Sequence, residues 1–131
     1  MKRRSVVLDW FKHGDQPIPA ASRIGPLLIT GGVHGVDRQT GDLPSDPEGQ
    51  IRHMFKNLAS VLEAGGATWD DVARVTVYIG SPAYRAIVNV YWVKAFPEEA
   101  SRPARHTMIN GNLPAMMHAQ CDAIAFIESP N

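Results

Sequence analysis

The sequence predicts an α+β fold in which two helices pack on one face of a mixed β-sheet. Two segments carry apolar residues at helical spacing, and shorter apolar or alternating segments that are typical of strands stand around them. The 131 residues have the length of one domain. We therefore expect a single domain over residues 1–131 with the element order β-β-α-β-α-β-β.

The N-terminal third is expected to supply two strands and the turns around them. Residues 5–11 and residues 27–33 are each typical of a strand, and the second of these runs into glycines. Residues 13–26 are rich in turn-forming residues, which predicts a loop. An additional strand near residues 33–37 would fit the pattern, and residues 37–46 should hold a turn.

A long helix follows this turn. Ser45 and Glu48 have the spacing of a capping box, and Pro47 suits the first turn of a helix. The glycines at 65 and 66 are expected to end the helix. Its apolar face is formed by four residues at helical spacing, namely Ile51, Phe55, Leu58 and Leu62.

The second half of the chain predicts a strand, a helix and two more strands. Residues 71–80 alternate between apolar and polar side chains, which is typical of a strand. A serine and a proline at 81–82 begin a second helix, and Pro97 ends it. Residues 105–109 and 119–127 are expected to be the last two strands.

Several of these strands are apolar on both faces, for example residues 27–29 and 121–127. Two helices can cover only one face of such a sheet. We therefore expect the other face to be buried against sister subunits in a homo-oligomer.

Composition limits the classes of partner and compartment. Lys plus Arg and Asp plus Glu each number 13, so the chain has no basic excess, which argues against nucleic acid as a partner. No apolar run approaches the length of a membrane span, and the N-terminal apolar stretch is too short for a signal peptide. The lone cysteine, Cys121, excludes an internal disulfide, and together these features predict a cytoplasmic protein without a membrane partner.

Arg105 is the first candidate for a binding residue. It stands at the start of a predicted strand, directly after Pro103 and Ala104, so its backbone has little freedom. The fixed fork of donors on a guanidinium matches a carboxylate or a phosphate. The alternative is an ordinary ion pair at the surface or at an interface.

The glycine-rich segment, the histidines and the cysteine give weaker indications of a functional site. The glycines of residues 30–35 are not followed by a helix, which argues against a dinucleotide site; Gly31 and Gly32 instead allow a turn or a close approach to a ligand. The five histidines show no zinc-site spacing, so we expect no metal and no cofactor. Cys121 lies in an alternating apolar strand, where a cysteine is usually an inert small hydrophobe.

Residues 102–126, RPARHTMINGNLPAMMHAQCDAIAF, resemble the signature of the reactive-intermediate deaminase family, also called the Rid, YjgF or endoribonuclease L-PSP-like family. The family pattern is Pro-Ala-Arg, a strand, a Leu-Pro turn, and a strand that ends in acidic-Ala-Ile-Ala. Here these elements are residues 103–105, 113–114 and 122–125. Four segments upstream are also similar to the family, namely IGPLLITGG, TGDLPSD, NLASVLEAGGATWDDVARVTVYI and VNVYW. The resemblance therefore covers nearly the whole chain.

The resemblance implies a chorismate-mutase-like α+β fold and a homotrimer whose sheets pack inward, with three pockets at the subunit interfaces. It implies hydrolysis of enamines and imines such as 2-aminoacrylate to keto acids and ammonia, with the substrate carboxylate held by Arg105. The alternative is a non-catalytic module of the same fold that binds small carboxylates. An endoribonuclease or translation inhibitor is a less favoured alternative, because the chain is neutral overall.

This chain departs from the family pattern at several polar positions. Gln120 stands where active members have a glutamate that positions the attacking water; a glutamine can orient water but cannot accept its proton. Thr107 replaces a cysteine and Gly31 replaces a serine, whereas Asn89 matches the helix asparagine. We therefore expect a divergent member in which the catalytic residues are Arg105, Gln120 and Thr107. The expected substrate-binding residues are Arg105, Gly31, Gly32, His34 and Asn89.

Two histidines are further candidates for proton transfer. His34 follows the glycine pair, and His118 precedes the last strand. Either is a candidate base for a pocket whose usual glutamate is absent.

Overall fold

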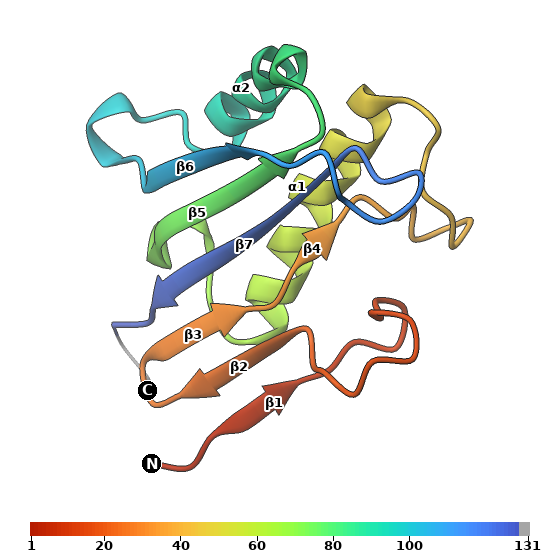
Figure 1. Ribbon diagram of the computed structural model, residues 1–131. Helices are drawn as coiled ribbons and strands as arrows, with labels where there is room; N and C mark the ends of the chain where they lie inside the picture. The colour runs from red at the N-terminus through yellow and green to blue at the C-terminus, as the bar shows by residue number, and fades with distance from the viewer. Residues whose placement is uncertain (129–131) are drawn as a thin grey trace.

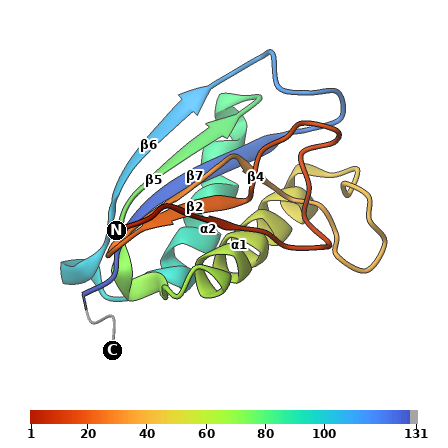
Figure 2. The same cartoon turned by 90° about the horizontal axis from the view of Figure 1, so that it is seen from below.

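One mixed seven-stranded sheet carries both helices on the same face (Figures 1 and 2). The structure is a computed structural model, and it describes residues 1–128. The strand order is β1-β2-β3-β7-β5-β6, and the short β4 pairs with β7; within residues 1–128, only β5 and β6 run parallel. The strands are β1 (Arg4–Val6), β2 (Ala21–Ile24), β3 (Leu27–Thr30), β4 (Val33–His34), β5 (Val72–Ile79), β6 (Ala104–Ile109) and β7 (Ala119–Phe126). The predicted α+β class, with two helices on one face, is confirmed.

The core lies between the sheet and its two helices, α1 (Pro47–Ala64) and α2 (Arg85–Ala95). Short 3-10 turns at residues 69–71, 82–84 and 99–101 connect these elements to the strands. Side chains from both layers are completely buried here, among them Leu28, Ile51, Met54, Leu58, Val61, Val75, Val77, Ile79 and Val88.

The N-terminal region differs from the sequence prediction. The first strand spans only Arg4–Val6 rather than residues 5–11, and Leu8 and Phe11 form an isolated bridge after it. The predicted loop 13–26 ends in a strand, β2, that pairs with β3 through a tight turn at Gly25, where φ is +55°. The prediction missed β2 because it is short and half-polar. The additional strand expected near residues 33–37 is present as β4.

The cap of α1 also differs from the prediction. Asp46, not Ser45, caps the helix, and its Oδ2 accepts a 2.8 Å hydrogen bond from the Gly49 amide. Glu48 instead contacts Arg52, so the predicted capping box is wrong. The helix ends where expected, with Gly66 in the left-handed region at φ +90°.

The sheet face opposite the helices carries large exposed apolar side chains. Cross-strand pairs place Leu27 beside Phe126, and Ile29 beside Ile124, on this open face. Its exposed apolar residues include Ile24, Leu27, Ile29, Met108 and Phe126. From the sequence, we expect this face to be buried against sister subunits, and that contact stays a prediction.

Candidate functional site

The strand register separates the predicted site residues into two groups. Arg105 pairs with Val75, and Val75 pairs with Ala123 on β7; both partners are buried under the helices. Directly paired side chains lie on the same face of a sheet, so Arg105 emerges on the helix-covered face. Gln120 lies three residues before Ala123 on β7 and therefore emerges on the open face. One chain does not bring Arg105 and Gln120 together.

Arg105 is held against α2 by two contacts. Its Nη2 donates a 2.7 Å hydrogen bond to Asn89 Oδ1, and its guanidinium carbon lies 4.9 Å from the centre of the Trp92 ring. Asn89 and Trp92 are three residues apart on one face of α2. The contacts fix the orientation of the guanidinium and leave other N–H donors of the fork for an anion.

The electrostatic surroundings of Arg105 favour an anionic ligand. Burial lowers the pKa of its guanidinium, and the positive charge of Arg85 lowers that pKa further. An arginine still remains cationic at neutral pH. None of the ion pairs found within residues 1–128 includes Arg105, so its charge is not neutralised by an acidic side chain there.

Thr107 shares the helix-covered face with Arg105. It pairs with Val77, which in turn pairs with Cys121, and both partners are buried. Thr107 itself is half-buried. The arginine cluster, as we call it, consists of Asn89, Arg105 and Thr107.

The second group surrounds the glycine turn between β3 and β4. Gln120 pairs with His34, and a Cβ atom on Gly32 would lie only 3.4 Å from Gln120 Oε1. The glutamine amide therefore lies directly beside the Gly32 backbone, at the distance of an ordinary van der Waals contact for such a Cβ atom. Gly31 precedes it, and its amide donates a 2.8 Å hydrogen bond to Ala20 O. These four residues, Gly31, Gly32, His34 and Gln120, are called the glycine cluster below.

His13 belongs beside the glycine cluster, although the sequence analysis did not select it. Its Nε2 donates a 2.6 Å hydrogen bond to Gly32 O. The Nδ1 of His13 is buried and has no hydrogen-bond partner within residues 1–128. His13 also lines a hollow of about 370 Å³ together with Lys12 and Gln16. It lies 19 residues from Gly32 in an irregular loop, where no periodic pattern marks it.

The surroundings of His34 favour the neutral form of its imidazole. Burial lowers its pKa most, the hydrogen bond to Lys12 O opposes that change, and the nearby His13 lowers the pKa further. The Phe11 ring packs against both imidazoles, at centroid distances of 4.6 Å from His34 and 5.3 Å from His13. Like that of His13, the Nδ1 of His34 is buried without a partner in the described part of the chain.

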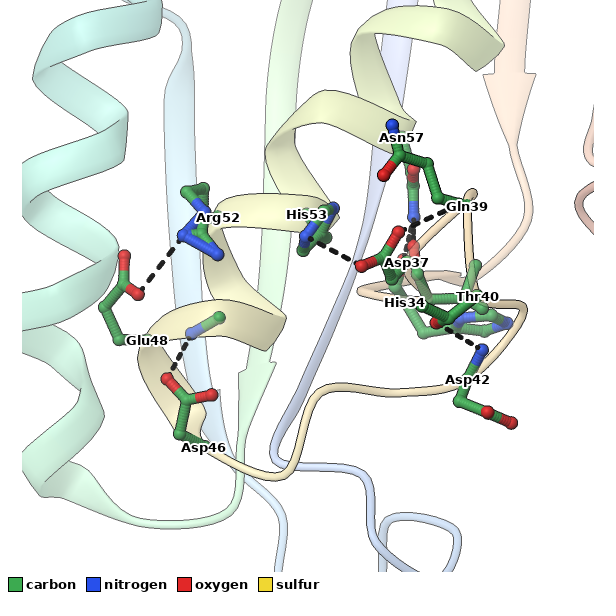
Figure 3. A network of polar contacts seen from close by, with 12 residues as sticks. His34, Asp37, Gln39, Thr40, Asp42, Asp46, Glu48, Arg52, His53 and Asn57 are labelled. Carbon is green, nitrogen blue, oxygen red and sulfur yellow. Dashed lines mark hydrogen bonds and ion pairs between the residues drawn. The ribbon is translucent and has the colours of Figure 1, made fainter.

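The backbone around His34 is anchored to α1. Asn57 Nδ2 donates 2.9 Å hydrogen bonds to the carbonyl oxygens of His34 and Val36 (Figure 3). The loop that follows is tied to the same helix by His53, whose Nε2 lies 3.8 Å from Asp37 Oδ2. The helix thus holds the backbone of His34 and of the loop that follows it.

His118 takes part in loop contacts. Its Nε2 donates a 3.1 Å hydrogen bond to Ser45 O, and its ring meets that of Tyr84 edge-on at 5.6 Å. Its backbone amide donates to the buried Gln50 side chain. These contacts join the loop before β7 to the start of α1.

Cys121 is buried in the core, with 1% of its surface exposed, as its position in an alternating strand predicted. Burial raises the pKa of its thiol, so the reactive thiolate is disfavoured. Within residues 1–128, no three His, Cys, Asp or Glu side chains gather as metal ligands would. In the same range, no helix combines the length and apolar character that crossing a bilayer requires.

Comparison with known proteins matches residues 15–127 to the family model described as Endoribonuclease L-PSP. A RutC family protein of Pyrococcus horikoshii is 32% identical over 113 residues, which cover 86% of this chain and 88% of the relative. The 2-iminobutanoate/2-iminopropanoate deaminase of Escherichia coli is 31% identical over 103 residues, 78% of this chain and 80% of the enzyme.

Solved structures resemble the whole fold. A putative endoribonuclease from Thermotoga maritima has a TM-score of 0.87 and 31% identity over 98% of this chain and 100% of its own. A probable translation initiation inhibitor from Rhodopseudomonas palustris has a TM-score of 0.86 and 28% identity over the same shares. These neighbours have the same arrangement of sheet and helices.

Proposed function

Because the chain belongs to the endoribonuclease L-PSP, or Rid/YjgF, family, we propose that it hydrolyses small enamines and imines that carry a carboxylate. The products are a keto acid and ammonia. The observation that carries the proposal is the half-buried guanidinium of Arg105, which Asn89 and Trp92 hold in place. Relatives about 31% identical are named as deaminases of 2-iminobutanoate and 2-iminopropanoate, which supports this reaction class.

The proposed pocket lies between two subunits of a homotrimer. The arginine and glycine clusters emerge on opposite faces of one sheet, so a small substrate cannot touch both clusters of the same chain. Because β6 is an edge strand of the sheet, a neighbouring copy whose open face packs against this edge would bring its glycine cluster to the arginine cluster of the first copy. The exposed apolar residues of that face support such packing.

The chemistry requires little from the protein beyond positioning. An enamine first takes a proton on carbon and gives up one from nitrogen, which yields the imine. Water then adds to the C=N carbon, a proton passes to nitrogen, and the carbinolamine expels ammonia to leave the keto acid, without any redox change. Such hydrolysis proceeds readily in water, so a fixed substrate and an oriented water are the main contributions of the site.

Each residue has a defined role in this scheme. Arg105 binds the carboxylate, and Asn89 holds the guanidinium in position. Gln120 orients the water without accepting its proton, and Thr107 donates a hydrogen bond to the reacting group. His34 offers a neutral imidazole for proton transfer.

A non-catalytic module that binds small carboxylates in the same pocket is the second candidate. Gln120 favours it, because an amide cannot act as the base at the position of the family glutamate. Binding of RNA is not part of either proposal, since basic and acidic residues balance at 13 each. The buried, unpaired Cys121 fits a cytoplasmic location for both.

Keto-acid release from enzymatically generated 2-aminoacrylate and 2-iminobutanoate tests the proposal. Wild type should accelerate release, and Arg105→Met should lose most of the acceleration because the carboxylate loses its partner. Arg52→Met removes an exposed arginine from α1 and serves as the matched control. No acceleration by a folded wild-type oligomer would reject the deaminase in favour of the binding module.

A further inference from the structure

A second arginine stands beside the carboxylate clamp. Arg85, Asn89 and Trp92 occupy positions i, i+4 and i+7 of α2, so they form one stripe along the helix. Arg105 contacts the last two members of this stripe. Arg85 therefore lies one helical turn beyond the Asn89–Arg105 hydrogen bond, and its side chain is exposed.

The position of Arg85 is unfavourable in the unliganded chain. It is the first residue of α2, where the positive end of the helix dipole repels a cation. It also repels Arg105, whose guanidinium it destabilises. The ion pairs within residues 1–128 are Arg52 with Glu48 and His53 with Asp37, and neither reaches this pair of arginines. A ligand with two negative groups would relieve both repulsions.

We propose that the natural substrate carries a second carboxylate on its side chain, with Arg105 binding the carboxylate beside the imine carbon and Arg85 binding the other. The substrate class is thus an imino or enamino dicarboxylate, as formed from an amino acid with an acidic side chain. This inference rests on the proposed function of the same pocket. Hydrolysis consumes one water, releases one ammonia and leaves a keto dicarboxylate.

Paired substrates of nearly equal size test the role of charge. An amino-acid oxidase generates the imine of glutamate or of its uncharged analogue glutamine, and semicarbazide competes for each imine. Wild type should prefer the glutamate imine by about tenfold, the effect of one charge-assisted hydrogen bond. Arg85→Gln should bring the ratio of the two rates close to one, and Arg85→Lys should keep most of the preference.

The control removes a different charge from the same helix. Lys94 lies in the last turn of α2, away from the stripe, so Lys94→Gln should keep the wild-type ratio. Equal rates for the two imines in wild type would overturn the inference. A preference that survives in Arg85→Gln would also overturn it, because the second carboxylate would then bind elsewhere.

Binding measurements separate this inference from the deaminase proposal. If the protein does not accelerate the hydrolysis of any imine, calorimetry measures binding affinities instead of rates. The two ligands are 2-oxoglutarate and 2-oxopentanoate, a monocarboxylate of equal chain length. Tighter binding of the dicarboxylate that is lost in Arg85→Gln would support the inference although the deaminase had failed. Equal affinity for the two compounds would overturn it.

Discussion

Arg105 and Gln120 emerge on opposite faces of one sheet, on strands β6 and β7 that β5 separates. The arginine faces α2 and binds Asn89, whereas the glutamine lies against Gly32 on the open face. A substrate as small as 2-aminoacrylate cannot bridge a sheet. Any site that uses both residues must therefore take them from different subunits.

Mixing two inactive variants tests this relationship. If the pocket is shared between subunits, Arg105→Ala and Gln120→Ala each remove one half of every pocket, so each variant alone should have little activity. Oligomers reassembled from an equal mixture should regain roughly a quarter of the wild-type activity, because one shared pocket in four pairs an intact arginine with an intact glutamine. The measurement is keto-acid release before and after joint unfolding and refolding. Unmixed variants refolded separately are the control, and a mixture no more active than these would contradict a shared pocket.

Restoring a carboxylate at the water-orienting position should raise activity. Gln120→Glu keeps the size of the side chain and supplies a base, which is worth about a hundredfold in typical enzymes. Its rate should fall as the pH drops and the new carboxylate becomes protonated, a dependence that Gln120→Met cannot have. Rates with 2-iminobutanoate across a pH series measure both effects. An unchanged rate in Gln120→Glu would mean that residue 120 does not position the attacking water.

The sequence predicted the regular parts of the fold because their periodicity follows from burial. The strands at residues 72–79 and 119–126 differ from their predicted ranges by a residue at most at each end, since one face of each is covered by helices. The strand β2 escaped prediction because its serine and arginine are only half-buried. The helix cap moved from Ser45 to Asp46 because adjacent polar residues can both serve as caps, and backbone geometry selects one.

The candidate site was harder to predict, because its geometry depends on contacts between distant segments. The position after Pro103 and the donor fork marked Arg105, the family resemblance marked Asn89, and the structure adds the hydrogen bond between them. Nothing local marks His13, whose ring reaches Gly32 across 19 residues. Gly35 was not selected either, although a Cβ there would overlap the Gln50 backbone on α1.

The loop before β7 should depend on one buried side chain. Gln50 is completely buried; its Nε2 donates 2.7 Å hydrogen bonds to Pro44 O and Met116 O, and its Oε1 accepts from the His118 amide. Gln50→Ala leaves these three groups without their partner and should lower the free energy of unfolding by about 3 kcal/mol. Urea denaturation measures the loss. Arg52→Ala, which removes an exposed ion pair from the same helix, should cost less than about 0.5 kcal/mol. Equal losses in the two variants would show that Gln50 does not anchor the loop.

The stability of the fold should fall in mild acid because of His34. Burial lowers the pKa of this imidazole in the folded state, with a further lowering by His13, and the hydrogen bond to Lys12 O only partly opposes it. The unfolded chain therefore binds a proton more readily, and its His34 titrates near the ordinary value of about 6.5. The contribution of His34 is complete above that pH and is lost progressively as the pH falls below it.

His34→Gln removes the titrating group while keeping a polar side chain of similar length. The free energy of unfolding of wild type should drop more steeply than that of the variant between about pH 7.5 and 5.5, the range in which histidine changes charge. Urea denaturation at several pH values and one fixed protein concentration measures both slopes, because assembly would otherwise alter the apparent stability. Parallel slopes would mean that the folded chain accepts a proton on His34 as easily as the unfolded chain does. In that case the imidazole would be charged in mild acid and could not serve there as the neutral proton acceptor beside Gln120.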